Sequence, residues 1–151
     1  MRNIDVALEM YRKGEYKKAE KLFKQEAKKE NCIAEYYLAF FLDYGVNNVI
    51  NKRRALKWYK KSALHGYEKS AVIVANRYFK GEGCFKSNKK SFYWMKESMK
   101  SQNPCYQYNF AKYYLNGWGC KESKAKAFYW YIKSANQGCQ EAQKVVKEWV
   151  W

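Results

Sequence analysis

The chain has 151 residues, a length that suits a single domain with one continuous hydrophobic core. It carries 30 Lys and Arg against 14 Asp and Glu, which gives a formal net charge of +16. Such a charge excludes no fold but favours an acidic protein, nucleic acid or an anionic surface as partner, unless it is only a solvated coat. No apolar run is long enough to cross a bilayer, so we expect a cytoplasmic protein without a membrane span.

The first segment, residues 1–32, is expected to form an irregular pair of helices. Gly14 supplies the turn between them, and Ala19, Leu22 and Ala27 have the spacing of one apolar helix face. This pair departs from the pattern of the chain that follows it. Such a departure is typical of the end of a repeat array, where one face of the outermost unit meets water.

A period of 36 residues organises the next part of the chain. Four kinds of residue keep this interval: Ala39, Ala75 and Ala111; Gly45, Gly81 and Gly117; Asn51, Ser87 and Ser123; and Trp58, Trp94 and Trp130. The period predicts three units, 33–68, 69–104 and 105–139. A fixed interval of this length indicates a solenoid in which each unit packs on its neighbours.

Each unit predicts two helices joined by a loop. The first helix is expected over 33–44, 69–80 or 105–116, where a small Ala between large apolar residues lets a neighbouring helix approach closely. It ends at the periodic glycine, because glycine readily adopts the positive φ that leaves a helix. Asn47, which follows Gly45, is expected to adopt the same conformation.

The second helix of each unit begins at the periodic Asn or Ser, whose side chain accepts a hydrogen bond from an otherwise unpaired backbone N–H. The tryptophans of the three second helices could form a stacking platform for bases. Segment 140–151 has Ala142 and Val146 in the register of another first helix and is expected to cap the array. The sequence therefore predicts about nine helices in one all-α domain, 1–151.

The stretch AKAFYWYIKSANQG at residues 125–138 resembles the Sel-1-like repeat, a relative of the tetratricopeptide repeat, and the resemblance extends over 34–138. Cys84 and Cys120 replace the loop valine of the family, and Gln102 replaces its final glycine. The resemblance implies an α/α superhelix that acts as an adaptor or scaffold protein. It also implies that each tryptophan packs its second helix against the first helix of the same unit, instead of stacking on bases. In bacteria it also implies a link to host contact or to secreted toxins.

No group of residues predicts catalysis, a cofactor or a metal site. His65 is the only histidine and has no evident catalytic partner, so we expect a surface or packing residue, with a general base as the alternative. Cys84 and Cys120 lie one unit apart. Stacked helices are roughly 8–10 Å apart and a disulfide needs Cα atoms within about 7 Å, so we expect free thiols. The chain is therefore predicted not to be an enzyme.

The resemblance places the first helices along a concave groove, where a partner protein would bind. The groove-facing positions are Tyr36, Phe40, Tyr44, Val72, Asn76, Lys80, Tyr108 and Lys112. Aromatic residues on a rigid surface bury much area at little entropic cost, although Phe40 or Tyr108 could instead pack between repeats. We expect an acidic protein partner, and the specific hypothesis is a bacterial immunity protein that neutralises a toxin domain.

The second helices carry most of the positive charge and lie on the convex face in related superhelices. Residues 51–65 contain six Lys or Arg and no acid. A ridge formed by Arg53, Arg54, Lys57 and Lys60 would bind phosphates with salt-dependent, sequence-independent affinity. Nucleic-acid binding through this basic face is therefore the alternative function.

Overall fold

The structure is a computed structural model that describes residues 1–149, and all regular structure in this part of the chain is helical. The α-helices are α1 (Asn3–Arg12), α2 (Tyr16–Ala27), α3 (Cys32–Tyr44), α4 (Lys52–Leu64), α5 (Glu68–Lys80), α6 (Asn88–Glu97), α7 (Pro104–Asn116), α8 (Lys124–Asn136) and α9 (Gln140–Trp149). Over the described residues the predicted all-α fold with nine α-helices is confirmed. The last two residues of the expected capping segment, 150–151, lie outside them.

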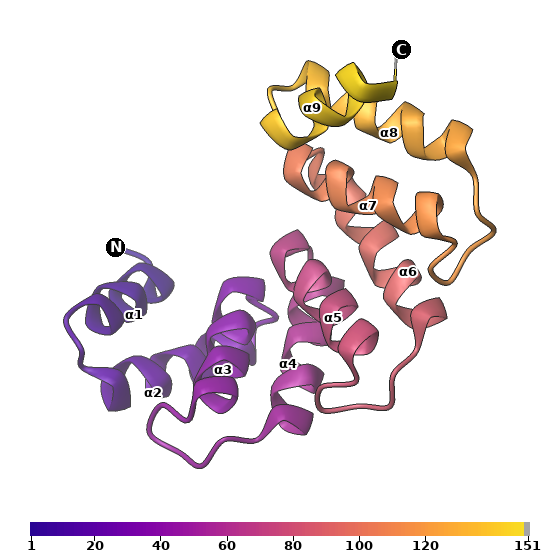
Figure 1. Ribbon diagram of the computed structural model, residues 1–151. Coiled ribbons are helices and arrows are strands. Elements are labelled where there is room, and N and C mark those ends of the chain that lie inside the picture. The colour runs from indigo at the N-terminus through magenta and orange to yellow at the C-terminus, as the bar shows by residue number, and fades with distance from the viewer. Residues whose placement is uncertain (150–151) are drawn as a thin grey trace.

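The helices form an open arc with the two chain termini at its ends (Figure 1). The odd-numbered helices lie along the inner side of the arc and the even-numbered helices along the outer side, most clearly where α6 and α8 lie outside α5 and α7 (Figure 1). Each α-helix packs mainly on the helices next to it in sequence. This arrangement is that of a solenoid. No helix within residues 1–149 is both long and apolar enough to cross a membrane.

Glycines end the first helix of each unit where the period predicts. Gly45, Gly81 and Gly117 have φ values of 71°, 75° and 63°, and each donates its N–H to the carbonyl four residues earlier. Asn47 has φ 63°, so its predicted left-handed conformation is confirmed. The middle unit ends differently from the other two, because α6 gives way to a 3-10 helix, Ser98–Ser101, before Gln102 turns the chain with φ 55°.

Short polar side chains cap the starts of the helices. The predicted caps of α4, α6 and α8 each accept the N–H three residues later and are confirmed: Asn51, Ser87 and Ser123. The helices α3 and α7 have caps that the 36-residue period does not predict. Asn31 and Asn103 each accept two backbone N–H groups there. The helix between them, α5, follows Tyr67 and has no side-chain cap.

The hydrophobic core runs through the middle of the arc between its two layers of helices. Ala39, Ala75 and Ala111 have no exposed surface, as a close approach of neighbouring helices requires. Trp94 is buried, and the Trp130 ring lies 5.2 Å from the ring of Phe110 on the first helix of its own unit. The tryptophans therefore serve mainly in packing.

The loop between the two helices of a unit lies directly against the start of the second helix of the preceding unit. A β-carbon added at Gly83 would lie 2.6 Å from the carbonyl oxygen of Lys52, and one added at Gly119 would lie 2.1 Å from that of Asn88. No side chain fits at such a distance from backbone. The second glycine of each Gly-x-Gly pair is therefore required by this close approach as well as by its positive φ.

Candidate interaction surfaces

The eight positions predicted for the groove lie on α3, α5 and α7, on the inner side of the arc (Figure 1). They differ widely in exposure: Tyr44, Asn76 and Lys80 are exposed, Phe40, Val72, Tyr108 and Lys112 are half-buried, and Tyr36 is buried. The set is therefore only partly available to a partner. Its accessible members are one aromatic ring on α3 and polar or cationic side chains on α5.

Tyr36 belongs to the core. Its ring centroid lies 5.2 Å from that of Tyr67 and 5.8 Å from that of Tyr59. The ammonium nitrogen of Lys69 lies 5.1 Å from the Tyr36 ring centroid. These contacts leave Tyr36 9% exposed, so it joins α3 to its neighbours instead of facing solvent.

The rings of Phe40 and Tyr44 lie side by side, with centroids 4.6 Å apart. Tyr44 is 61% exposed and supplies most of the accessible aromatic surface at this end of the face. On α7, the ammonium nitrogen of Lys112 lies 4.4 Å from the centroid of the Tyr108 ring. The predicted groove therefore combines aromatic rings with lysines, one of which is held over a ring by a cation–π contact.

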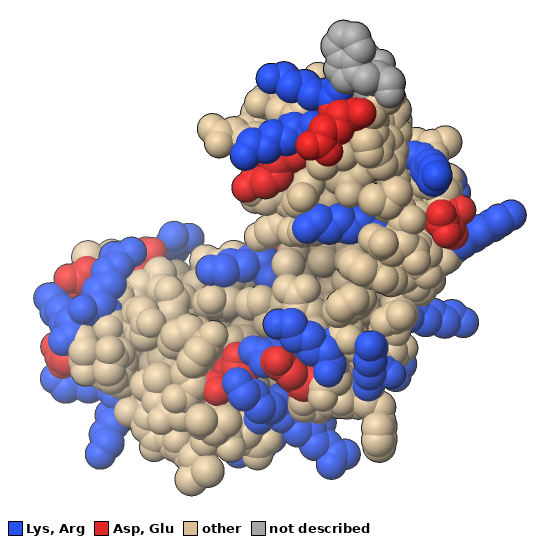
Figure 2. All heavy atoms as spheres, viewed as in Figure 1, with Lys and Arg blue, Asp and Glu red and all other residues tan. Residues whose placement is uncertain are grey.

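On the face that Figure 2 shows, Lys and Arg side chains lie along the arc and outnumber Asp and Glu. The predicted basic patch on α4 is divided between two hollows. Arg53, Lys57 and Lys60 line one of them. Arg54 lines another, together with Glu20 and Trp58. Adjacent positions on a helix point about 100° apart, which explains why Arg53 and Arg54 face different surroundings.

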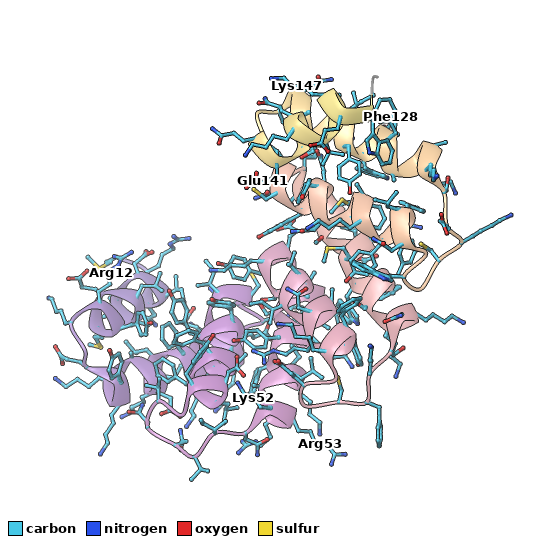
Figure 3. All side chains as sticks on the ribbon, viewed as in Figure 1. Arg12, Lys52, Arg53, Phe128, Glu141 and Lys147 are labelled. Atoms are coloured by element: carbon cyan, nitrogen blue, oxygen red, sulfur yellow. The ribbon has the colours of Figure 1, made fainter. Side chains whose placement is uncertain are left out.

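The first hollow, called the basic cavity below, lies between α4, the end of α5 and the start of α6 and has a volume of about 450 Å³. Four cations line it: Arg53, Lys57, Lys60 and Lys90. Three large apolar or aromatic residues also line it: Leu56, Tyr78 and Phe85. Arg53 projects outward from the start of α4 (Figure 3). The cavity therefore combines an apolar surface with a cationic wall.

Within residues 1–149, none of these four cations has a carboxylate oxygen within the 4.0 Å that defines an ion pair. Two of them are oriented by an aromatic ring instead. The ammonium of Lys60 donates to the Tyr78 hydroxyl at 3.0 Å. The Lys60 and Lys90 nitrogens lie 5.6 Å and 5.4 Å from the Tyr78 ring centroid. The positive charge of the cavity is therefore not neutralised by the described part of the chain.

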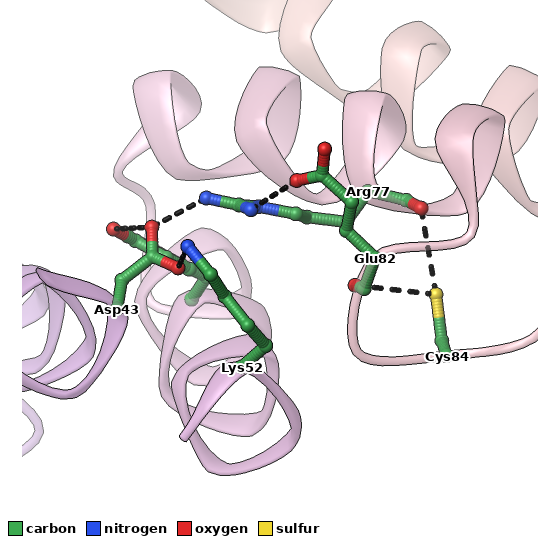
Figure 4. A network of polar contacts seen from close by, with 6 residues as sticks. Asp43, Lys52, Arg77, Glu82 and Cys84 are labelled. Carbon is green, nitrogen blue, oxygen red and sulfur yellow. Dashed lines mark hydrogen bonds and ion pairs between the residues drawn. The ribbon is translucent and has the colours of Figure 1, made fainter. Parts of the chain in front are cut away.

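A buried ion network lies beside the basic cavity (Figure 4). The side chain of Asp43 is 1% exposed and accepts hydrogen bonds from the Lys52 ammonium at 2.8 Å and the Tyr59 hydroxyl at 3.3 Å. The oxygen that accepts from Tyr59, Oδ2, also pairs with Arg77, which belongs to the following unit. Burial, and then the Asp43 carboxylate, raise the pKa of Tyr59, so its hydroxyl stays a donor. The network joins α3, α4 and α5.

The same network fixes the loop that forms one wall of the cavity. Arg77 pairs with Glu82 of the loop, and its backbone carbonyl accepts a weak hydrogen bond from the Cys84 thiol at 3.5 Å. Burial raises the pKa of Cys84, which keeps this thiol protonated. Farther along, the Ser87 N–H donates to the Tyr78 carbonyl at 2.9 Å. The loop is thus tied to α5 at three points.

A second buried polar contact joins α3 to the end of α4. Glu35 is 2% exposed, and its Oε2 lies 2.7 Å from His65 Nδ1. Two periods later the same positions are occupied by a neutral pair, in which Gln137 Nε2 donates to Gln107 Oε1 at 2.7 Å. Because an uncharged pair makes the same link, the contact of His65 is structural and ties the two helices of one unit together.

The sequence did not point to several residues of these surfaces. Lys90, Cys84 and Phe85 of the basic cavity come from segments outside α4. Within residues 1–149, no group of three or more His, Cys, Asp or Glu side chains is placed to hold a metal ion. The five cysteines are free thiols, of which Cys105 is exposed and Cys139 buried.

Helix pairs that repeat every 36 residues and stack into an arc define an α/α repeat solenoid. The family model of the Sel1 repeat matches residues 32–67, 69–100 and 106–139, and the chain belongs to the Sel1 repeat family. Sel1 repeat proteins generally act as protein-interaction modules and are typically not enzymes. A comparison with curated proteins finds no match.

Solved structures include similar Sel1 repeat proteins. A Sel1 repeat protein from Oxalobacter formigenes is 27% identical, with a TM-score of 0.77. The match covers 84% of this chain and 96% of the Oxalobacter protein. A protective antigen present in uropathogenic Escherichia coli strains, which displays an SLR fold, is 25% identical with a TM-score of 0.77; 85% of this chain matches only 27% of that antigen. Cysteine rich protein B of Helicobacter pylori, at 16% identity and a TM-score of 0.62, shares the fold, covering 83% of this chain and 96% of its own.

Proposed function

We propose that the chain is an adaptor that binds an acidic partner protein along the inner face formed by α3, α5 and α7. The observation that carries this proposal is the exposed ring of Tyr44 beside Phe40. Asn76 and Lys80 are exposed on α5, and Lys112 lies on α7. An aromatic anchor supplies affinity because its burial removes much apolar surface from water. The lysines favour acidic partners by steering them to the face.

The proposal is tested by capturing partners from a lysate of the organism that encodes the chain, at low and at high salt. The double variant Tyr44→Ala/Lys80→Glu removes the anchor and reverses one charge. A control, Lys89→Glu, makes the same charge change on the outer helix α6, where Lys89 is also exposed. We expect one protein to be retained at both salt concentrations by the wild type and the control, and lost from the double variant. Equal retention by all three would contradict the inner-face proposal.

A more specific form of the proposal is that the partner is a toxin domain and the chain is its bacterial immunity protein. The net charge of +16 supports an acidic toxin, because opposite charges speed association and favour the correct partner. The test is to titrate the protein into an activity assay of an acidic toxin encoded beside it. Inhibition should reach completion at equal molar amounts. Full toxin activity in excess protein would contradict the immunity role but would not affect the adaptor proposal.

Nucleic-acid binding through the outer face is the second candidate. It is favoured by the cations of α4 that have no carboxylate oxygen within 4.0 Å among residues 1–149. Affinity for any strand should then fall steeply as salt rises, because each phosphate contact releases counterions. Charge reversal at four positions should abolish the binding: Arg53, Arg54, Lys57 and Lys60. Unchanged binding after that reversal would eliminate this function.

A further inference from the structure

The basic cavity has a chemistry that suits one kind of ligand. Its cationic side chains Arg53, Lys57, Lys60 and Lys90 surround an apolar surface that includes Leu56 and Phe85. Phe85 is 96% exposed at the rim, so its ring is available for contact with a partner. We propose that this cavity binds an acidic segment of a protein partner and seats one large apolar side chain of that segment.

The size of the cavity supports a side chain as occupant. About 450 Å³ falls within the range of small ligand sites, so the hollow can enclose one aromatic or aliphatic side chain with some of its backbone. The carboxylates that flank this side chain would then lie near the rim, where Arg53 and Lys57 are exposed. Apolar contact supplies affinity and the flanking charges supply orientation.

The cavity is preformed, which reduces the entropy lost on binding. Its loop wall cannot move closer to α4, because Gly83 already lies against the Lys52 carbonyl without room for a β-carbon. The ion pair between Arg77 and Glu82 holds the same loop from the other side. A ligand therefore meets a wall that is already in place.

An acidic peptide fits this cavity better than a nucleic acid does. Of the two aromatic rings that line the cavity, Tyr78 already makes cation–π contacts with Lys60 and Lys90, so a base could stack only on Phe85 at the rim. A phosphate backbone also has no apolar group to cover Leu56 and Phe85. A segment of Asp or Glu around a Phe or Leu satisfies both the charges and the apolar surface.

The next unit supplies a matched control. In register with Arg53 and Lys60 stand Lys89 and Lys96, so its charge is similar. In register with Leu56 stands Phe92, whose ring lies 5.6 Å from that of Tyr114, the counterpart of Tyr78. Because Phe92 is larger than Leu56, we expect it to occupy the corresponding space in the next unit. The two units therefore differ more in the expected size of the hollow than in the number of cationic side chains around it.

The experiment measures fluorescence anisotropy of defined probes on the whole chain. The first probe is a peptide of alternating Glu and Ser with one central Phe, and the second has Ser in place of that Phe. The third is a single-stranded oligonucleotide of the same net charge. We expect the wild type to bind the Phe peptide about tenfold more tightly than the Ser peptide, the effect of burying one aromatic side chain. Tighter binding of the oligonucleotide than of the Phe peptide would overturn the proposal.

Charge variants then locate the binding site. Arg53→Glu/Lys60→Glu should weaken the Phe peptide about tenfold or more, whereas Lys89→Glu/Lys96→Glu should weaken it about twofold or less. Both variants change the net charge equally. Equal losses in the two would mean that only the overall charge acts, and the proposal would be wrong.

Two further variants test the hollow without changing the charge. Leu56→Phe introduces the residue of the next unit, and Phe85→Ser removes the exposed ring; both should erase the preference for the Phe peptide. Because Leu56 is buried, thermal melting of Leu56→Phe accompanies the assay, and Phe85→Ser gives an independent answer at an exposed position. A preference unchanged in Phe85→Ser would refute the cavity as the seat of the apolar side chain.

This inference rests on the proposed function, since it gives the interaction module a second contact for the same acidic partner. The two can fail separately. The peptide assay uses no native partner. If the protein bound the Phe and Ser peptides equally, the cavity proposal would be wrong, but the capture result for Tyr44→Ala/Lys80→Glu would still stand. A native partner that binds Arg53→Glu/Lys60→Glu as tightly as the wild type would likewise overturn the inference alone.

Discussion

Arg77 pairs with the buried carboxylate of Asp43, which belongs to the preceding repeat. At the next junction the equivalent positions hold an aromatic pair, Phe79 and Tyr113, with ring centroids 6.2 Å apart. Loss of one partner of a buried ion pair is strongly destabilising. Arg77→Met should therefore lower the free energy of unfolding by about 3 kcal/mol in urea denaturation.

The double variant Asp43→Phe/Arg77→Tyr copies the following junction and removes both charges at once. Its free energy of unfolding should lie within about 2 kcal/mol of the wild type. Well-packed apolar residues commonly replace a buried ion pair without loss, and the main cost is the buried Tyr59 hydroxyl, which loses its acceptor. A double variant no more stable than Arg77→Met would mean that the pair contributes through contacts that the aromatic junction cannot supply.

The Glu35–His65 contact can be tested with its own counterpart. His65→Ala leaves the buried carboxylate of Glu35 without its hydrogen-bond partner, and we expect a loss of about 2 kcal/mol. Glu35→Gln/His65→Gln recreates the Gln107–Gln137 pair and should stay within about 0.5 kcal/mol of the wild type. Gln137→Ala is the control. It leaves a neutral group unpaired, and a larger loss there than in His65→Ala would contradict the explanation.

Two glycines separate the effect of close approach from that of backbone conformation. Gly119 and Gly138 both have positive φ, 71° and 95°, but only at Gly119 would a β-carbon meet backbone, 2.1 Å from the Asn88 oxygen. Gly138→Ala should cost about 1 kcal/mol from its φ alone. Gly119→Ala should cost about 3 kcal/mol, because the loop must also move away from α6. Equal losses in thermal unfolding would show that the contact is unimportant.

Buried tyrosines make the fold sensitive to alkali. Burial raises the pKa of Tyr131 to about 12 and raises that of Tyr113 as well, whereas an unfolded tyrosine has a pKa of about 10. Their stabilising contribution is complete below about pH 10 and declines above it, because the unfolded chain then releases protons that the folded chain keeps. Urea denaturation should show the free energy of unfolding falling from about pH 10 to about pH 12.

Tyr131→Phe is the control for this pH dependence, since it keeps the ring and removes the ionisable hydroxyl. The slope of stability against pH should become less steep by up to about 1.4 kcal/mol per pH unit. An unchanged slope would mean that Tyr131 ionises equally in the folded and unfolded chains.

The helices, their turns and the caps of α4, α6 and α8 could be predicted because local residues determine them. A glycine with positive φ ends a helix wherever it stands, and an Asn or Ser cap bonds to an N–H only three residues away. Because the chain repeats every 36 residues, each of these local signals occurs in three units. In the first unit, Gly45 and Asn47 have the predicted positive φ and Asn51 forms the predicted cap, although Asn47 stands where the other units have a second glycine.

The contacts between units were harder to predict, because they depend on partners about 30 residues apart. Asp43 and Arg77 nevertheless break the period visibly: Asp43 stands in register with Phe79 and Leu115, and Arg77 with Phe41 and Tyr113. An acid and a base at positions that are apolar elsewhere indicate a buried pair. The hollow of the basic cavity had no such signal, since it depends on the size of Leu56 and on the path of a loop from the next unit.

The burial of Tyr36 could not be predicted from its register alone. Val72 and Tyr108 occupy the same position in the other units and are half-buried. The long Tyr36 side chain turns toward Tyr67 instead of toward solvent, and the choice depends on residues of α4 and α5 that the period does not specify.

The seating of each loop on the preceding helix start has an evolutionary consequence. Because backbone meets backbone at Gly83 and Gly119, the angle between successive units is set by atoms that every substitution elsewhere leaves unchanged. Two residues beyond these glycines, Phe85 and Lys121 are exposed and chemically unlike. An array built this way can acquire new binding partners through its rim residues while its curvature is inherited intact.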